Sequence, residues 1–405
     1  MKDKRQKLKI LFICQNFWPE NFRSTDVVNN LTQDGHHVEV LTSNPNYPEG
    51  KIYKGYKWYN SKTEKFNSNI KIHRVPTIPR GRSNYFLIIL NYLSFIIFGT
   101  FFGLQKLKRT NFDIILVFAS SPIFQLIIGY FIKKQKNIKL ITWVQDLWPE
   151  NLQAVEIINN RFILKIIHKF TLIFYRLNDA IIAQSKSFKK VLKKRFNKKV
   201  YFIPNYAEIF KNIKTKKVKD SRFVLVYAGN LGRAQKLITL LKAAKKIKEN
   251  KKIVIKIFGD GIELNKLLSY KKKNRLDNVI IYGKVSKKRI YREYKNADAL
   301  YLSLVNNKFL NYTIPAKLQT YLYISKPIIA SASGETKKII EDSNAGICTP
   351  PENVNLLYKS LNKIMKLKKN ELKKFENNSK KYFNENYERN LINKKFRNIF
   401  ENYRK

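Results

Sequence analysis

The sequence predicts an α/β fold made of two doubly wound domains, each with a mostly parallel sheet. Short apolar segments rich in β-branched residues alternate with helical stretches along most of the chain. These segments lack strict polar alternation, which is typical of parallel strands that helices bury on both faces. The series stops once, at Pro204–Asn205 and the lysine-rich stretch after it, and then begins again. Two α/β domains of similar size are therefore expected.

In the first half, helical stretches such as Ser24–Gln33 separate the expected strands, and Val27, Val28 and Leu31 recur there at helical spacing. The strands expected in this half are Lys9–Cys14, His37–Thr42, Ile70–Arg74, Ile114–Phe118, Lys139–Val144, Ala180–Gln184 and Val200–Ile203. Parallel strands of this kind bind ligands outside their carboxyl ends, at the point where the strand order reverses. An N-terminal domain over residues 1–207 follows from this pattern.

The second half shows the same alternation after a linker at Glu208–Asp220. Its expected strands are Phe223–Ala228, Ile253–Phe258, Val279–Tyr282, Ala299–Ser303 and Pro327–Ser331. Its expected helices are Gln235–Lys248, Ile262–Lys272, Lys287–Tyr294 and Ala316–Leu322, and the chain from Leu356 onward reads as helices. We assign residues 208–385 to a C-terminal domain and residues 386–405 to a final helix.

The composition is strongly basic and rich in apolar residues. The 405 residues include 80 Lys and Arg against 29 Asp and Glu, which gives a formal net charge of +51. With 44% hydrophobic and 13% aromatic residues the chain can bury a sizeable core, which excludes a wholly disordered protein. Its two cysteines, Cys14 and Cys348, exclude a disulfide framework and a cysteine-based metal site, and the four histidines have no metal-ligand spacing.

A charge of this size invites a nucleic acid or an anionic membrane as partner. The basic residues are spread along the whole chain, and no helix-turn-helix, RNA-recognition or zinc signature accompanies them. A basic nucleic-acid-binding protein is therefore kept only as an alternative of a different class, and we expect no nucleic-acid partner. The charge is better explained by an anionic small molecule in a cleft and by anionic lipid.

One long segment, Phe86–Leu104, carries no charge over 19 residues and has Arg82 before it and Lys106 after it. Its length just reaches that of a spanning helix, but a span would separate the α/β units on its two sides. Three interpretations stay open: a monotopic helix lying in a membrane face, a buried helix, and a span. The basic N-terminus is followed by only five apolar residues, so no signal peptide is predicted. We expect a cytoplasmic protein, peripheral on the inner face of the cell membrane.

Two glycine-bearing turns follow neighbouring strands of the second half, Tyr227–Lys236 and Phe258–Gly261. Glycine lets a backbone approach closely, and the start of a helix offers free N–H groups to an anion. Arg233 and Lys236 would add positive charge beside a diphosphate. Plain tight turns would show the same spacing, so the turns alone do not define a site.

In the first half, Trp143–Glu150 ends an apolar strand and brings Asp146 and Glu150 to its carboxyl end. The two tryptophans of this stretch are candidates for stacking on a sugar. In the alternative interpretation, Asp146 caps the next segment and the tryptophans belong to the core. After the first strand, Asn16–Arg23 offers three further polar side chains to the same edge, unless it is only a cap and a loop: Glu20, Asn21 and Arg23.

Two helix starts near the end of the second half carry further candidates. Thr313–Gln319 leads into a helix, and Pro315 suits its first turn, where a missing N–H costs little. Ser333–Thr336 begins another helix, in which Glu335 either stabilises the helix dipole or accepts hydrogen bonds from a ribose or sugar hydroxyl.

Together these stretches resemble, in order and spacing, the retaining glycosyltransferases of the family-four type. The most similar branch contains the N-acetyl-L-fucosaminyltransferases of O-antigen and capsule assembly. The residues that carry the resemblance in the first half are Phe17–Asp26, Gly35–Val40, Asn44–Gly50 and Gln145–Glu150. In the second half they are Ala228–Gln235, Gly259–Gly261, Thr313–Leu322, Lys326–Pro327 and Gly334–Glu335. The resemblance runs from about Lys9 to the C-terminus.

The resemblance implies the GT-B fold, in which two Rossmann-like domains face each other across a cleft and C-terminal helices pack back on the N-terminal domain. It implies transfer of a sugar, expected to be N-acetylated, from a UDP-sugar with retention at the anomeric carbon. The implied acceptor is a saccharide on a polyprenyl diphosphate, which an apolar, basic-flanked surface such as Phe86–Leu104 would suit. No metal or other cofactor is expected, because basic side chains and helix N-termini take up the charge of the departing diphosphate.

The site residues follow from the same resemblance. Catalytic roles fall on Asp146 and Glu335, the latter through a donor hydroxyl. The donor-binding residues are Asn230, Gly232, Arg233, Lys236, Gly259, Thr313, Lys317 and Gln319. Of these, Arg233, Lys236 and Lys317 are expected to hold the diphosphate. The acceptor side comprises Trp18, Glu20, Asn21, Arg23 and Glu150.

The sequence also departs from the broad family. A pair of glutamates usually stands before and within the helix at Ala316–Leu322, where this chain has Tyr312 and Thr320. The usual Arg and Lys of the diphosphate loop are Asn230 and Gln235, and a common histidine before Asp146 is Gln145. These departures indicate a subfamily and leave the diphosphate ligands open. A GT-B epimerase acting on a UDP-sugar without an acceptor is the second enzyme hypothesis.

Overall fold

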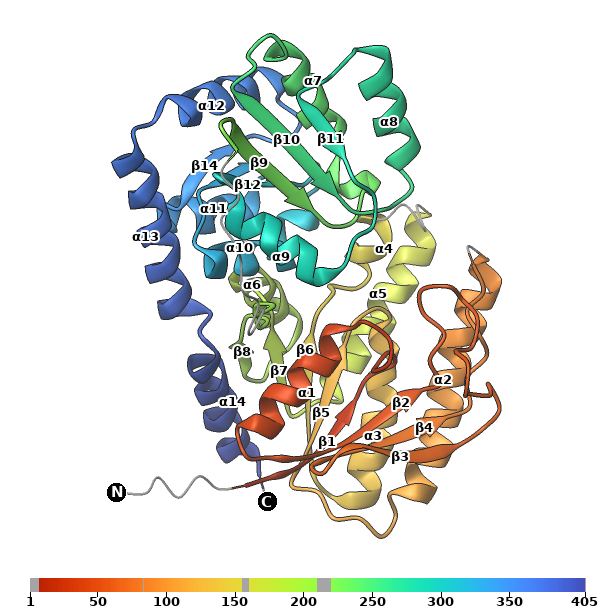
Figure 1. The fold of residues 1–405 in the computed structure, drawn as a ribbon. Coiled ribbons are helices and arrows are strands. Elements are labelled where there is room, and N and C mark those ends of the chain that lie inside the picture. The colour runs from red at the N-terminus through yellow and green to blue at the C-terminus, as the bar shows by residue number, and fades with distance from the viewer. Residues whose placement is uncertain (1–6, 83, 155–159, 210–219, 405) are drawn as a thin grey trace. The chain divides into compact units, whose positions relative to one another are not determined.

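The computed structural model describes residues 7–82, 84–154, 160–209 and 220–404. The chain divides into two compact units, one of Met1–Tyr206 with Arg389–Lys405 and one of Ala207–Glu388. Each unit is an α/β domain with its own sheet (Figure 1). The predicted fold class, two doubly wound domains, is confirmed. The divisions lie beside the boundaries expected at residues 207/208 and 385/386.

The first unit has an eight-stranded sheet in the order β3-β4-β2-β1-β5-β6-β7-β8. Its strands are β1 (Lys9–Ile13), β2 (His37–Ser43), β3 (Lys62–Asn67), β4 (Ile70–Val75), β5 (Ile114–Ala119), β6 (Lys139–Val144), β7 (Ala180–Ala183) and β8 (Val200–Phe202). All neighbours pair in parallel except β3, which runs antiparallel to β4. The strand order reverses between β1 and β5, so a switch point lies at their carboxyl ends. Within this unit only β3 is additional to the expected strands, as β14 (Gly346–Thr349) is in the second. The sequence of β3, KTEKFN, lacks an apolar run because this edge strand is largely exposed.

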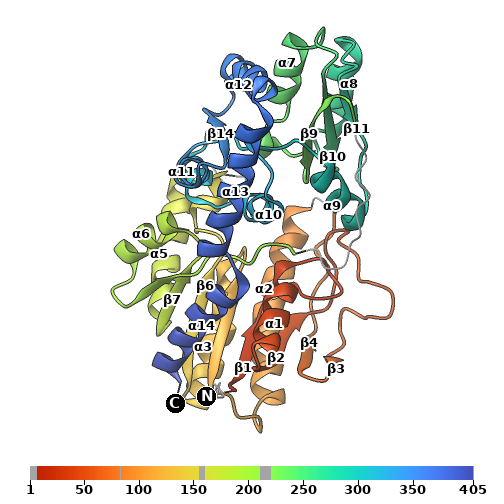
Figure 2. The same cartoon turned by 60° about the vertical axis from the view of Figure 1, so that its left-hand side comes forward.

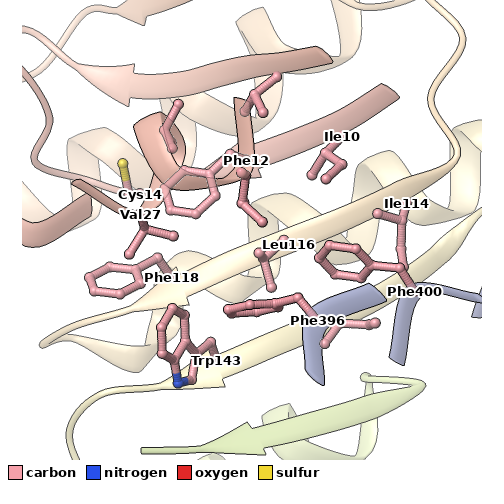
Figure 3. Packing of buried hydrophobic residues seen from close by; sticks show 14 of the residues in the cluster. Ile10, Phe12, Cys14, Val27, Ile114, Leu116, Phe118, Trp143, Phe396 and Phe400 are labelled. Atoms are coloured by element: carbon pink, nitrogen blue, oxygen red, sulfur yellow. The ribbon is translucent and has the colours of Figure 1, made fainter. Parts of the chain in front are cut away.

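Helices cover both faces of this sheet: α1 (Arg23–Gln33), α2 (Tyr85–Lys106), η1 (Ile123–Gln125), α3 (Leu126–Lys136), α4 (Glu150–Ala154), α5 (Arg161–Arg176), α6 (Lys186–Arg195) and α14 (Arg389–Tyr403). On one face, Val27 of α1 and Phe396 and Phe400 of α14 pack with strand residues such as Phe12 and Leu116 (Figure 3). The C-terminal helix therefore packs on the N-terminal domain, as expected.

The two tryptophans of the Trp143–Glu150 stretch belong to this hydrophobic interior. Trp143 is wholly buried, and its ring centroid lies 5.5 Å from that of Phe118 and 5.0 Å from that of Phe396 (Figure 3). Trp148 is buried as well, with its ring centroid 5.3 Å from that of Phe124. The interpretation that these rings stack on a sugar is wrong, because neighbouring side chains already cover them.

The apolar segment Phe86–Leu104 forms most of α2, which is half buried. Gly99 and Gly103 face inward, where an added Cβ at Gly99 would lie 2.6 Å from Ile128 of α3. By length and composition α2 is apolar enough to cross a membrane. The strands before and after it, β4 and β5, nevertheless belong to one sheet, so the interpretation of a span is wrong. The interpretation of a buried helix is wrong too, because the outer side of α2 is exposed.

The second unit has a six-stranded, fully parallel sheet in the order β11-β10-β9-β12-β13-β14. Figure 2 shows β9, β10 and β11 beside one another in this unit. Its strands are β9 (Phe223–Ala228), β10 (Ile253–Phe258), β11 (Val279–Ile281), β12 (Ala299–Ser303), β13 (Ile328–Ser331) and β14 (Gly346–Thr349). Its helices are η2 (Arg233–Gln235), α7 (Ile238–Lys246), α8 (Leu264–Lys273), α9 (Lys287–Asn296), η3 (Leu310–Tyr312), α10 (Ala316–Ile324), α11 (Gly334–Ser343), α12 (Val354–Lys366) and α13 (Lys369–Asn386). The order reverses between β9 and β12, so the switch point lies at the glycine turn after β9.

One helix of the second unit begins later than expected. The predicted helix Gln235–Lys248 is replaced by the short η2 and by α7, which starts at Ile238. The break occurs because Lys236 adopts a left-handed backbone with φ of 44°. This conformation ends η2 and turns the chain before α7 begins.

Candidate functional site

The first strand of the first unit leads into a loop that is organised by the carboxylate of Glu20. Glu20 is buried, and its Oε1 accepts hydrogen bonds from the backbone N–H groups of Asn46 and Tyr47, both at 2.7 Å. Its Oε2 accepts from Asn16 Nδ2 at 3.1 Å and from the Phe17 N–H at 3.2 Å. Burial raises the pKa of this carboxyl, and the hydrogen bonds act in the opposite direction. Glu20 therefore ties the loop after β1 to the loop Asn44–Gly50 and holds the two loops together from within.

Glu20→Gln is expected to lower the free energy of unfolding by about 2 kcal/mol, because its amide NH₂ would face two backbone or side-chain donors. Thermal or urea unfolding of the variant measures the loss. Glu49→Gln is the matched control, since Glu49 is an exposed carboxylate in the loop Asn44–Gly50 and its change should stay within about 0.5 kcal/mol. Equal stability of Glu20→Gln and wild type would contradict a positioning role for this carboxylate.

The other acceptor-side candidates near this loop differ in exposure. Trp18 is 38% exposed, with its ring centroid 5.0 Å from that of Phe66. Asn21 is exposed, and Arg23 is half-buried at the first position of α1. The sequence gives no sign of a fourth residue, Arg74, which is fully buried and donates hydrogen bonds to the carbonyl oxygens of Trp18 and Ser43. Arg74 thus supports the backbone that presents Trp18.

Asp146 follows β6 at the carboxyl edge of the same sheet. Its Oδ2 accepts hydrogen bonds from the N–H and the Oγ of Ser121, both at 3.0 Å. Ser121 Oγ also accepts from Trp148 Nε1 at 3.0 Å and from Asn151 Nδ2 at 2.7 Å. Burial raises the pKa of Asp146, and the Ser121 hydrogen bonds oppose that rise. Because these partners come from the loop after β5, the alternative in which Asp146 caps the following segment does not describe it.

Glu150 lies one turn further along and is paired with Arg195 of α6. Arg195 Nη1 lies 3.1 Å from Glu150 Oε2 and 3.2 Å from the Trp148 carbonyl, and its Nη2 contacts Glu150 Oε1. A bidentate guanidinium fixes the orientation of the carboxylate and leaves each of its oxygens one further lone pair. The structure therefore gives Glu150 a partner in α6, and its expected place on the acceptor side stays a prediction.

In the second unit, the two glycine turns lie against each other at the carboxyl edge of the sheet. The Gly229 N–H donates to the Phe258 carbonyl at 2.9 Å, and the Leu231 N–H donates to the Asp260 carbonyl at 2.8 Å. Gly259 has φ of 138°, and a Cβ there would lie 1.8 Å from the Gly229 carbonyl oxygen. The backbone contact therefore requires glycine at position 259.

Asn230 and Gln235 stand where the broad family usually has diphosphate-binding cations. Their side chains form hydrogen bonds within the turn itself. Asn230 Nδ2 lies 3.4 Å from Gln235 Oε1, which also accepts from the Gly232 N–H at 3.2 Å. Arg233, a cation of the same turn, has an exposed side chain. Lys236 Nζ lies 3.4 Å from Glu352 Oε1, so its charge already has an acidic partner.

Lys317, in the first turn of α10, is a cation that packs against the glycine turn after β9. Its Nζ lies 2.5 Å from the hydroxyl of Tyr227 and 3.8 Å from the centroid of that ring. A Cβ at Gly229 would lie 2.2 Å from Lys317 Cε, so the lysine stem lies against the backbone of the turn. Burial lowers the pKa of Lys317 to about 7. In the described part of the chain, no carboxylate forms an ion pair with this ammonium.

In the second unit, no feature of the sequence marks Tyr227 as part of this site. It is fully buried at the end of β9, and its hydroxyl donates to the Asn230 carbonyl at 2.7 Å while it accepts from Lys317. In sequence it is simply one more apolar residue of a buried strand. Its role becomes visible only because α10, which follows a different strand, brings Lys317 to it.

The remaining candidates of the second unit lie on η3, α10 and α11. Thr313 is half-buried just after η3. Gln319 is fully buried, and its amide atoms have no hydrogen-bond partner among the described residues. Its side chain is enclosed in this structure, and its expected contact with the donor stays a prediction. Glu335 is buried in the first turn of α11 next to Gly334, where a Cβ would lie 2.0 Å from the Asn311 carbonyl oxygen.

Two family models match the chain, one over each unit. Residues 24–208 match "Glycosyltransferase Family 4", and residues 208–382 match "Glycosyl transferases group 1". A relative in Escherichia coli strain K12, "Putative colanic acid biosynthesis glycosyl transferase WcaI", is 22% identical over 414 residues. That match covers 95% of this chain and 99% of the relative.

Solved structures of similar fold cover nearly the whole chain. Sucrose-phosphate synthase from Thermosynechococcus elongatus has a TM-score of 0.75 at 14% identity, over 98% of this chain and 99% of its own. The Anabaena protein HepE, solved in complex with UDP and glucose, has a TM-score of 0.68 at 13% identity, over 98% of this chain and 100% of its own. At such identities the likeness concerns the fold.

Proposed function

We propose that this chain, a glycosyltransferase, transfers a sugar from a UDP-sugar to a lipid-linked saccharide. Its first unit belongs to Glycosyltransferase Family 4 and its second unit to the glycosyl transferases group 1. The name of the E. coli relative, which refers to colanic acid biosynthesis, supports a role in polysaccharide assembly. The UDP and glucose bound in HepE support a nucleotide-sugar donor. Retention at the anomeric carbon is part of the proposal, since the family-four resemblance implies it.

The observation that carries the donor assignment is Lys317. An ammonium group held against the glycine turn after β9, without a carboxylate partner in the described residues, suits the charge of a diphosphate. The turn after β9 lies at the switch point of the second sheet, where doubly wound folds bind nucleotides. We assign the diphosphate to Lys317 and to the backbone of the two glycine turns, with Arg233 as a further cation. Glu335 is assigned to a donor hydroxyl.

The acceptor is assigned to the first unit, with Asp146 accepting a hydrogen bond from its reacting hydroxyl. Asp146 lies at the carboxyl edge of the sheet and is joined to Ser121, close to the switch point between β1 and β5. Trp18 offers an exposed aromatic face to the saccharide beside this edge. We propose a polyprenyl diphosphate as the lipid, and peripheral contact with the membrane through the exposed side of α2.

The chemistry proposed needs no metal ion. The bond between the anomeric carbon and the diphosphate breaks as the acceptor oxygen bonds to that carbon, and the proton of the acceptor hydroxyl passes to the Asp146 carboxylate. The negative charge on the departing diphosphate is met by Lys317 and backbone N–H groups. UDP release is therefore expected to stay at its full rate in excess EDTA. A loss of activity that Mg²⁺ or Mn²⁺ restores would contradict this part of the proposal.

The test of the function uses the full chain, a panel of UDP-sugars and a polyprenyl-diphosphate-linked saccharide. Release of UDP together with a mass increase of one sugar on the lipid is the expected result. Omission of the acceptor distinguishes the epimerase hypothesis, because an epimerase would convert the donor sugar without it. If no donor gives UDP release with any lipid-linked acceptor, the proposed function fails.

A further inference from the structure

The helix α5 exposes an apolar face that no described part of the chain covers. Five large apolar side chains along its length are between 41% and 71% exposed: Phe162, Ile163, Ile166, Phe170 and Ile173. Exposed apolar surfaces of this kind mark sites of interaction on soluble domains. The opposite side of α5 is anchored in its own unit, since Leu164, Thr171 and Tyr175 are buried. The exposed residues therefore form a continuous stripe on a firmly packed helix.

A row of cations runs beside this stripe. Arg161, Lys165 and Lys169 are four residues apart, which places them along one line of the helix, and all three are exposed. Arg176 extends the positive charge in the last turn. No aspartate or glutamate occurs in α5, nor in α2 and α3. The charged side chains of these three helices are therefore all cationic, and Lys133 of α3 is paired with Asp179, which follows α5.

The helices α2, α3 and α5 belong to one layer of the first unit. The connections through α3 and α5 move in the same direction along the sheet, from β5 to β6 and from β6 to β7, so right-handed crossovers place both helices on the same face. α2 contacts α3, and both α2 and α5 contact η1. α2 also exposes apolar side chains on its outer side, from Phe86 at 68% to Phe101 at 61%.

We propose that α5 is a second membrane-docking helix, which lies in the interface of an anionic bilayer together with α2. This inference rests on the proposed function in one respect only, that a lipid-linked acceptor would be met at such a surface. The chemistry of the partner follows from the helix itself: apolar side chains enter the boundary of the acyl chains while the cation row meets anionic headgroups. A second copy of the chain suits this face poorly, because pairing would bring rows of like charge together.

The docking is tested by sedimentation of the full chain with vesicles. Phosphatidylcholine vesicles with and without phosphatidylglycerol are compared, and wild type is expected to bind only the anionic ones, more weakly as salt is added. Lys165→Gln with Lys169→Gln is expected to lower the partition coefficient about thirtyfold, from roughly 1 kcal/mol per basic residue near the surface. Phe162→Ser with Phe170→Ser is expected to lower it at least tenfold.

Matched controls carry the same chemical changes on the second unit. Lys272→Gln with Lys273→Gln removes two exposed lysines of α8, and Ile262→Ser removes an apolar side chain that is 74% exposed. Both controls should bind vesicles as wild type does. Unchanged thermal unfolding and unchanged UDP affinity of the α5 variants would show that their fold is intact.

The docking proposal is overturned if the α5 variants bind anionic vesicles as tightly as wild type. It is also overturned if wild type self-associates in sedimentation velocity and the α5 variants lose that association, because the face would then bind a second copy. Failure of sugar transfer with intact vesicle binding counts against the proposed function alone. Normal transfer with unchanged vesicle binding in the α5 variants counts against the docking alone.

Discussion

Lys317→Met is expected to weaken UDP binding by roughly 10- to 100-fold, the range for losing a hydrogen bond to a charged group. The reason is that Lys317 brings an ammonium group against the glycine turn after β9. Isothermal titration of the full chain with UDP measures the change. Lys308→Met, which removes an exposed lysine of the same unit, is the matched control and should leave the affinity unchanged.

The affinity for UDP should also fall as the pH rises above 7. With a pKa of about 7, Lys317 is half charged at neutral pH, and a bound diphosphate favours its charged form. Affinity is therefore highest below this pKa and falls by at most about tenfold per pH unit above it, as expected for one proton. The Lys317→Met variant should lack this slope between pH 7 and 9. A slope that persists in the variant would contradict the assignment.

The same substitution is expected to stabilise the protein. Burial lowers the pKa of Lys317 in the folded state, so the unfolded chain binds the proton more tightly between about pH 7 and the usual lysine pKa. Wild-type stability consequently rises with pH across that window, and the buried ammonium is most costly below it. We expect Lys317→Met to raise the free energy of unfolding by about 2–4 kcal/mol at pH 6, and by less at pH 9. Lower affinity with higher stability would mark Lys317 as a binding residue.

Asp146→Asn is expected to lower kcat/KM for the lipid-linked acceptor by roughly 100-fold or more, within the range for removing a group that exchanges a proton or strong hydrogen bond with the reacting atom. Asparagine keeps an oxygen for the Ser121 hydrogen bonds, so the loop after β6 should stay folded. UDP affinity should not change, because Asp146 belongs to the first unit and the donor is assigned to the second. Initial rates at varied acceptor concentration measure the effect.

The pH dependence of turnover provides a second measurement on Asp146. Burial raises its pKa, so the ionised form is lost at a higher pH than for an exposed aspartate. Activity should therefore fall as the pH decreases through this raised pKa, and the variant should lack that acid limb. Asp277→Asn removes an exposed carboxylate of the second unit and is the matched control. Full activity of Asp146→Asn would remove Asp146 from the catalytic assignment.

The fold follows closely from the sequence because its strands are apolar runs buried on both faces. Such runs read clearly, whereas the exposed edge strand β3 gives only a weak signal. The candidate loops were also predictable, since each follows a buried strand. The sequence did not predict which residues of a loop stay open to a ligand. Glu20, Glu150 and Gln319 are all polar, and yet the structure encloses or pairs them.

By itself, the sequence determined the two α/β units and the loops that follow their strands, because alternation and motif spacing are local properties. Its resemblance to known enzymes indicated a glycosyltransferase. Only the tertiary structure decided which charges are free for function. Lys317 meets Tyr227 across 90 positions of sequence, and Glu20 meets Tyr47 across 27. The same holds for the apolar segment Phe86–Leu104, where packing of one side on the sheet leaves the other side exposed. Burial and partnership depend on distant segments, and these two properties set the charge and the reach of each side chain.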